Sequence, residues 1–109
     1  MNIQIFGKQK CFDTKKAERY FKERGVKFQS VDILQKGLSK GELNSVIAAV
    51  GIDALVSDKA EEYHLFKYLT PDAKPEKLSE CPKLFKTPIV RNGKSATVGY
   101  APDVWKNWD

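Results

Sequence analysis

A short apolar segment followed by an amphipathic helix pattern constrains the fold of this chain most. Residues 2–6 have the composition of a buried strand, and residues 14–24 carry an apolar stripe. Ala17, Tyr20 and Phe21 fall at i, i+3 and i+4, the spacing of one helix face. A second apolar segment, 26–33, follows Gly25, which ends the helix. This β-α-β order predicts two parallel strands joined by a right-handed crossover.

The remainder of the chain predicts a helical insertion, a β-hairpin and a last helix. Ser39 and Glu42 form a capping box that opens a helix ending before Gly51. Further helices are expected at 59–68 and from Pro75, which suits a first helical turn. Two short strands then meet through Asn92-Gly93, a strong hairpin signal, and a final helix opens at Pro102. Together these patterns predict an α/β fold, a mixed four-stranded sheet with flanking helices.

Length and composition predict one globular domain spanning residues 1–109, with 41% hydrophobic and 30% charged residues. No apolar stretch is long enough for a membrane helix and no signal peptide is visible, so we expect a cytoplasmic protein. The net charge of +5 comes from lysines scattered on helix faces, and no nucleic-acid motif accompanies it. His64 stands alone and no C-x-x-C pair exists, which argues against a metal site.

Cys11 is the strongest candidate for chemistry. It lies at the turn between the first strand and the first helix, where free backbone N–H groups and the positive end of the helix dipole are expected. Lys8, Lys10, Lys15 and Lys16 add positive charge nearby. These conditions lower the pKa of a thiol and favour the reactive thiolate.

The second cysteine, Cys81, is predicted to face the core three residues after Leu78, as a small hydrophobic side chain. The alternative is a resolving cysteine that moves to Cys11. Cys81 is far from C-x-x-C spacing with Cys11, which favours a core position for Cys81. Oxidation at Cys11 is then expected to give a sulfenic acid or a mixed disulfide with an external thiol.

Three segments in this order resemble the arsenate reductase and Spx family of thioredoxin-like proteins, and the resemblance extends over nearly the whole chain. They are Cys11 to Ala17, Lys86 to Val90, which contains a Pro-Ile-Val element, and Gly99 to Pro102 before the last helix. The resemblance implies the thioredoxin-like fold, with a cis-proline at Pro88 beside the reactive cysteine.

The resemblance also implies a chemistry. Cys11 stands at the position of the nucleophile that attacks arsenate, and glutathione with glutaredoxin acts as the external reductant, with no bound cofactor. The substrate would be a small oxyanion or a thiol compound. The backbone amides of Phe12, Asp13 and Thr14 would stabilise the thiolate and a bound oxyanion. Lys8 and Lys15 would assist through their charge.

The anion-binding arginines of the family are replaced in this chain. Thr87 stands where an arginine precedes the proline, and Gly99 or Tyr100 stands where a second arginine is expected. Lys86 and Arg91 are the nearby cationic substitutes. Without the forked guanidinium donors, arsenate reduction is expected to be inefficient.

The family resemblance leaves a regulatory alternative open. Spx-type regulators use a C-x-x-C pair as a redox switch and bind RNA polymerase, whereas Thr14 occupies the second position here. A lone cysteine with a lysine one turn later fits a reductase-like branch best. The sequence therefore predicts a single-cysteine thiol oxidoreductase, with a redox-responsive partner-binding protein as the alternative.

Overall fold

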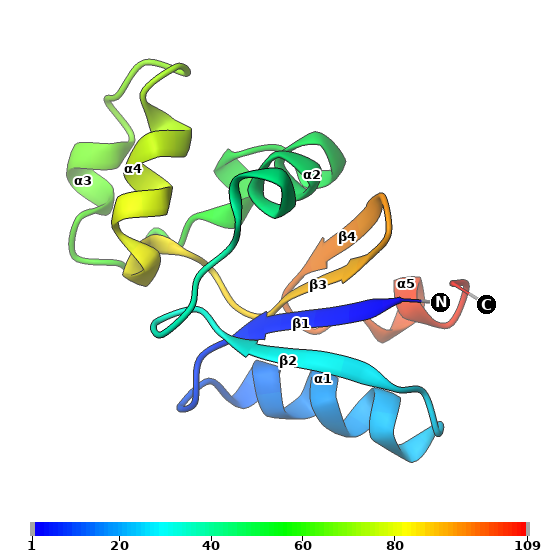
Figure 1. Ribbon diagram of the computed structural model, residues 1–109. Coiled ribbons are helices and arrows are strands. Elements are labelled where there is room, and N and C mark those ends of the chain that lie inside the picture. The colour runs from blue at the N-terminus through cyan, green and yellow to red at the C-terminus, as the bar shows by residue number, and fades with distance from the viewer. Residues whose placement is uncertain (1, 109) are drawn as a thin grey trace.

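The computed structural model describes residues 2–108 as a four-stranded mixed sheet with helices on both faces (Figure 1). The strands are β1 (Ile3–Gly7), β2 (Phe28–Asp32), β3 (Ile89–Asn92) and β4 (Ser95–Val98). The α-helices are α1 (Phe12–Glu23), α2 (Lys40–Val50), α3 (Tyr63–Phe66), α4 (Lys74–Glu80) and α5 (Pro102–Trp105). Two 3-10 turns, η1 (Asp53–Leu55) and η2 (Pro82–Leu84), connect the insertion to the sheet.

The order of the strands across the sheet is β2-β1-β3-β4. β1 and β2 are parallel, as the β-α-β pattern predicted, while β3 is antiparallel to both β1 and β4. β1 is therefore an inner strand, and the loop that follows it lies between the ends of β2 and β3. This arrangement brings residues 8–11 next to the segment that leads into β3.

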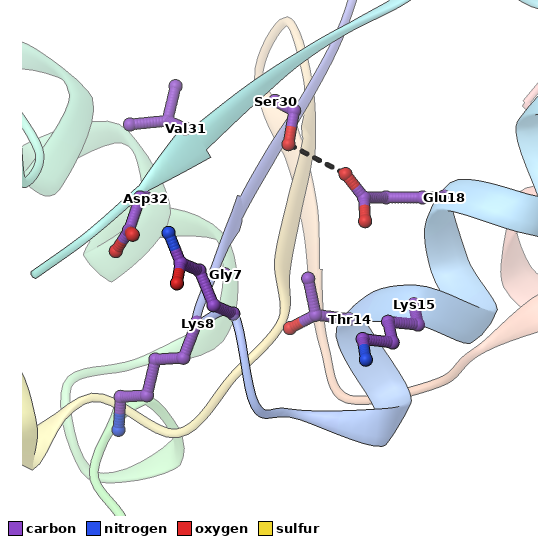
Figure 2. A pocket seen from close by; sticks show the side chains of 9 residues that line it. Gly7, Lys8, Thr14, Lys15, Glu18, Ser30, Val31 and Asp32 are labelled. Atoms are coloured by element: carbon purple, nitrogen blue, oxygen red, sulfur yellow. Dashed lines mark hydrogen bonds between the residues drawn. The ribbon is translucent and has the colours of Figure 1, made fainter.

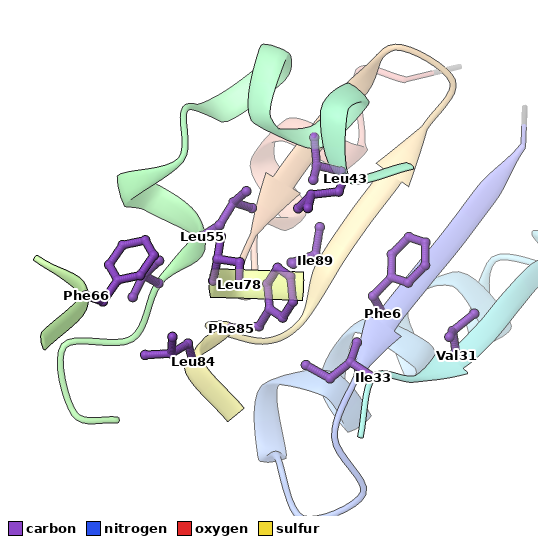
Figure 3. Close-up of a cluster of buried hydrophobic side chains, with 12 residues drawn as sticks. Phe6, Val31, Ile33, Leu43, Leu55, Phe66, Leu78, Leu84, Phe85 and Ile89 are labelled. Atoms are coloured by element: carbon purple, nitrogen blue, oxygen red, sulfur yellow. The ribbon is translucent and has the colours of Figure 1, made fainter. Parts of the chain in front are cut away.

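The sheet separates two hydrophobic clusters. One joins the sheet to α2 and to the α3–α4 insertion, and Figure 3 shows its large side chains, among them Phe6, Leu78 and Ile89. The other packs α1 and α5 on the opposite face, around Phe21 and Trp105. In Figure 1, α2 lies above the sheet and α1 below it. Alternation along the inner strands produces this division, because successive side chains point to opposite faces.

Three boundaries differ from the sequence prediction. The expected helix at 59–68 is helical only over Tyr63–Phe66, because Ala60 and Tyr63 donate their N–H groups to carbonyls three residues earlier, in successive turns. α1 begins at Phe12, two residues earlier than predicted, since Cys11 itself is its N-cap. The strand expected from Thr87 begins at Ile89.

The hairpin loop also differs by one residue from the Asn-Gly signal. Asn92 pairs with Ser95, so the two loop residues are Gly93 and Lys94. Gly93 has a φ of 59°, whereas Lys94 does not adopt a positive φ. Glycine at the first loop position with a positive φ is the pattern of a type II′ turn rather than the type I′ turn that Asn-Gly favours.

Gly7 permits the first turn of α1 to pack directly on the end of β1. A Cβ atom at this position would lie 2.2 Å from Thr14 Cγ2 and 2.6 Å from Thr14 Oγ1, inside van der Waals contact. Thr14 is itself buried, so its short side chain cannot move into solvent. The glycine is therefore required by close approach, and it sets the position of Thr14.

We expect Gly7→Ala to destabilise the protein by about 1–3 kcal/mol, because overpacking a closed contact forces the backbone to shift. Gly41→Ala is the matched control, because a Cβ at Gly41 meets nothing within 4 Å and the residue lies in α2. That control should be neutral or stabilising by roughly 0.5–1 kcal/mol. Urea unfolding of both variants measures the difference, and a Gly7→Ala variant as stable as wild type would contradict the steric argument.

Among the described residues, no helix has the combination of length and apolar character needed to cross a membrane.

Candidate active site

Cys11 is the N-cap residue of α1, directly after the loop that leaves β1. Its backbone N–H donates to the Lys8 carbonyl at 3.1 Å, and its own carbonyl accepts from the Lys15 N–H at 3.3 Å. The side chain makes no capping bond, and the sulfur is half-buried. The thiol is thus held at the start of a three-turn helix, where unpaired N–H groups carry partial positive charge.

The thiol contacts the segment that enters β3. Cys11 Sγ donates to the Thr87 carbonyl oxygen at 3.6 Å. The next peptide bond, Thr87–Pro88, is cis, as the resemblance implied, and Pro88 is buried. Residues 76 positions apart in the sequence therefore form the two walls of the site.

The pKa of the Cys11 thiol lies below its usual range. Partial burial acts in the opposite direction and is the largest single influence, but four groups that stabilise the thiolate by donating hydrogen bonds together outweigh it. The donors are the side chains of Thr14 and Thr87 and the backbone N–H groups of Thr14 and Asp13. These groups stabilise the thiolate because each donates a proton toward the negative charge. The lysines, which the sequence suggested, have a smaller part in the shift than the threonines.

Thr14 has a buried hydroxyl that is available to the sulfur. Its Oγ1 atom makes no hydrogen bond in the structure, in which the Cys11 S–H is directed to the Thr87 carbonyl. Ionisation of Cys11 removes that S–H and leaves the Thr14 hydroxyl free to donate to the thiolate. A buried donor without a partner is unfavourable, so the arrangement favours the ionised form.

A hollow of about 260 Å³ adjoins the site on the β2 side (Figure 2). Its walls are the end of β1, the first turns of α1 and the end of β2. Lys15, Glu18 and Asp32 bring charges of both signs to it, and Glu18 accepts a hydrogen bond from Ser30 Oγ at 2.7 Å. Thr14 lines this hollow and follows Cys11 by three positions, whereas Cys11 is not among the lining residues.

The structure brings together only part of the predicted set. Asp13, Thr14, Thr87 and Pro88 surround the thiol, whereas Arg91 does not join them. Arg91 lies three residues beyond Pro88, about 10 Å along β3. It bonds to Gln4 Oε1 at 2.6 Å and Ser45 Oγ at 3.2 Å, on the α2 face of the sheet.

Lys8 also differs from the prediction. Its ammonium donates to the carbonyl oxygens of Lys83 and Phe85, at 3.3 and 2.9 Å, rather than pointing into the hollow. Figure 2 shows the side chain extending away from Thr14 and Glu18. Burial lowers the pKa of Lys8, and the nearby charge of Cys11 opposes that shift.

Two exposed residues follow the thiol along α1. The Phe12 ring is 80% exposed, and Lys15 is exposed as well. The Phe12 ring therefore lies outside the wall of the site, whereas Lys15 lines the hollow.

Cys81 caps the end of α4 and packs half-buried against the larger hydrophobic cluster, as predicted. It is a free thiol, like Cys11, and its polar neighbours are Glu62 and Lys77, which form an ion pair at 2.7 Å. His64 is exposed on α3. Among residues 2–108, no three histidine, cysteine, aspartate or glutamate side chains are grouped so as to hold a metal ion.

Sequence reasoning did not assign a role to Gly7. A glycine just before a candidate nucleophile loop is a signal for close backbone approach, but only the structure shows that the approaching group is Thr14.

We expect the thiol of Cys11 to titrate below about 8.5, the usual cysteine value. The folded protein favours the thiolate, so the free energy of unfolding should rise with pH through the folded pKa and level off above the unfolded value. The measurement is the pH dependence of iodoacetamide alkylation in a Cys81→Ser background. A midpoint at or above the usual value would contradict the assignment of the four donors.

Comparison with known proteins identifies a matching family and similar sequences and structures. The family model described as the ArsC family matches residues 6–108. Global transcriptional regulator Spx 2 of Oceanobacillus iheyensis is 28% identical over 109 residues, which cover 94% of this chain and 80% of the relative. The solved structure of an arsenate reductase from Vibrio cholerae has a TM-score of 0.82 and 25% identity, covering 95% of this chain and 94% of that one.

The glutaredoxin-like protein NrdH-redoxin of Escherichia coli shares the fold more distantly, with a TM-score of 0.55 and 15% identity over 100% of this chain and 96% of that one. The β2-β1-β3-β4 sheet with its flanking helices is thus a thioredoxin-like fold. Because the family model matches nearly all of the sequence, the chain belongs to the ArsC family.

Proposed function

We propose that this chain is a thiol oxidoreductase in which Cys11 is the single nucleophile and an external thiol regenerates it. The observation that carries the proposal is the surroundings of the sulfur: two threonine hydroxyls and two backbone amides lower its pKa. A depressed pKa makes the thiolate available near neutral pH. Thr14 occupies the place of a second cysteine, so the electrons that return Cys11 to the thiol must come from another molecule.

The residues around the sulfur have separate proposed roles. The amides of Phe12, Asp13 and Thr14 face a small oxyanion or the sulfur of a thiol substrate bound at Cys11. Lys15 contributes positive charge at the mouth of the hollow, and Pro88 shapes the opposite wall. The external thiol is glutathione or a glutaredoxin, which places the reaction in a reducing compartment, the cytoplasm.

For an oxyanion such as arsenate the proposed steps balance as follows. The Cys11 thiol displaces one hydroxyl of H₃AsO₄, forming an S–As bond and releasing water. Glutathione then attacks the Cys11 sulfur, giving the Cys11–glutathione disulfide and H₃AsO₃, with the S–As electron pair remaining on arsenic. A second thiol, free or in a glutaredoxin, reduces that disulfide and restores Cys11. Overall, two thiols are oxidised to one disulfide as As(V) becomes As(III).

The proposal predicts that oxidised glutathione or mild peroxide with glutathione modifies Cys11 and leaves Cys81 reduced. Cys81 packs against the core beside the Glu62–Lys77 ion pair, and no cysteine lies at the C-x-x-C spacing from Cys11. Mass spectrometry of the wild-type protein should therefore show one glutathione per chain, on Cys11, which glutaredoxin removes. A stoichiometric Cys11–Cys81 disulfide in the monomer would refute the external-thiol mechanism.

A second candidate function is a redox-responsive regulator that binds a protein partner such as RNA polymerase. The observation in its favour is the 28% identity to a relative named a global transcriptional regulator. In this role the modification of Cys11 would change binding rather than complete a catalytic cycle.

Two measurements separate the candidates. Turnover of arsenate or of a glutathione mixed disulfide, in the presence of glutathione and glutaredoxin, supports the enzyme. Stoichiometric binding of purified RNA polymerase, changed by oxidation of Cys11 and accompanied by no turnover, supports the regulator. Cys11→Ser is the control in both, because it removes the sulfur and preserves the size of the side chain.

A further inference from the structure

We propose that Lys8 is a positioning residue that fastens the segment entering β3 to the Cys11 loop and thereby sets the contact between Cys11 and Thr87. The inference rests on Cys11 being the reacting group of the proposed function, but it concerns the thiol itself rather than any substrate.

The first observation is that Lys8 binds on both sides of the site. Its ammonium donates to the carbonyl oxygens of Lys83 and Phe85 at 3.3 and 2.9 Å. Its backbone carbonyl accepts from the Cys11 N–H at 3.1 Å. One residue is thus bonded to the residue that carries the sulfur and to the segment two residues before Thr87.

These bonds close a ring. Starting at Lys8, the ring passes through the Cys11 N–H, the Cys11 sulfur and the Thr87 carbonyl, returns along the backbone to Phe85, and ends at the Lys8 ammonium. Of its links, only the bond between the Lys8 ammonium and the Phe85 carbonyl ties the two walls together without involving the sulfur. The β1–β3 pairing reaches Phe6 and Ile89, so Lys8 is the loop-side tie to the residues that precede Thr87.

The segment is fixed on its other side as well. The Ser57 N–H donates to the Leu84 carbonyl and the Lys86 N–H to the Leu55 carbonyl, both at 2.8 Å, while Val56 forms a bridge with Phe85. These bonds hold the segment to η1, away from Cys11. Lys8 supplies the bonds from the loop side. Removal of the Lys8 ammonium should therefore let the segment move toward η1 while the bonds to η1 keep the segment folded.

A second feature is the environment of the ammonium. Lys8 is half-buried and its side chain is directed to backbone carbonyls rather than into the hollow. Carbonyl oxygens accept hydrogen bonds from the ammonium but carry no net charge. These bonds therefore position the segment that enters β3 and do not neutralise the charge of Lys8. The charged groups that also face this loop are Asp13 and Lys15 on α1, Glu18 and Asp32 across the hollow, and Lys83 and Lys86 on the segment itself.

The test is a double-mutant cycle read by the pH dependence of Cys11 alkylation, with Cys81→Ser throughout. Lys8→Met removes the ammonium donor, and Thr87→Val removes the side-chain hydroxyl that helps to lower the pKa of the Cys11 thiol. If Lys8 acts through Thr87, Lys8→Met should raise the alkylation midpoint by about one pH unit alone and by half of that or less in the Thr87→Val background. An equal shift in both backgrounds would show a direct effect of charge and overturn the inference.

Two further variants keep the test decisive. Lys10→Met removes a neighbouring exposed lysine of the same loop, and it should leave the midpoint unchanged to within about 0.2 pH unit, since an exposed charge is screened. Lys8→Gln retains an N–H donor without the charge, so its alkylation midpoint compared with that of wild type tests the bonds to the segment even if Lys8→Met does not fold. A midpoint close to that of wild type in Lys8→Gln supports the positioning role. A rise as large as that expected for Lys8→Met contradicts it.

Absence of turnover with every substrate would overturn the proposed enzyme but would leave the alkylation cycle intact. Additive shifts in the cycle would overturn the role of Lys8 even in an active enzyme.

Discussion

Cys11→Ser is expected to reduce thiol-dependent turnover by at least about a thousandfold, the scale seen when a nucleophile is removed from an active site. A serine hydroxyl at this position does not ionise near neutral pH, and the hydrogen bonds that stabilise the thiolate have no anion to stabilise. The assay is the reduction of a glutathione mixed disulfide with glutathione and glutaredoxin present.

Cys81→Ser is the matched control, because it makes the same chemical change at the end of α4, beside Glu62 and Lys77. It should retain wild-type turnover. Activity that survives in Cys11→Ser would overturn the assignment of the nucleophile, and activity lost equally in both variants would point to a general effect on folding.

Thr87→Arg is expected to raise the rate of arsenate reduction by about tenfold to a hundredfold. Thr87 lies against the sulfur, at the position where the family resemblance places an arginine. One added charge-assisted hydrogen bond to the oxyanion in the transition state is worth about 1.5–3 kcal/mol, and each 1.36 kcal/mol corresponds to about tenfold in rate. The guanidinium N–H groups also replace the hydroxyl donor that the substitution removes.

Thr87→Lys separates the effect of charge from that of the forked geometry. A lysine supplies a point charge and cannot bind two oxygens in one plane, so its gain should be clearly smaller than that of arginine. Steady-state arsenate reduction by wild type and both variants makes the comparison. If wild-type turnover is already fast and Thr87→Arg does not improve it, other groups hold the anion and the correspondence to the family arginine is wrong.

The nucleophile and most of the fold follow from local patterns. The apolar spacing of Ala17, Tyr20 and Phe21 predicts α1, and the strand before it predicts a parallel β-α-β unit, which the sheet confirms. Cys11 at the junction is a local feature too, because strand, loop and helix start are adjacent in the sequence. Periodicity acts over a few residues, so one sequence is enough to reveal it.

Short and irregular elements were less predictable. The insertion between α2 and α4 is helical only over Tyr63–Phe66, since turns that bond three residues apart compete with a helix there. The hairpin turns at Gly93 and Lys94 because the strand register, set by pairing with β1, extends β3 through Asn92. In both cases packing and pairing outweigh local propensity.

What the sequence determined by itself is the place of the thiol, at the N-terminus of a helix that follows the first strand. What only the tertiary structure decided is which groups surround it. Lys8 and Arg91 were both expected to bind an anion, but β3 pairs with β1 so that Arg91 meets Gln4, and the segment before β3 takes the Lys8 ammonium. Thr14 and Thr87 supply the side-chain hydroxyls that lower the pKa of the Cys11 thiol. Apart from that of Thr14, which follows Cys11 closely, these contacts join residues more than seventy positions apart. A local pattern carries no information about which long-range pairs will form.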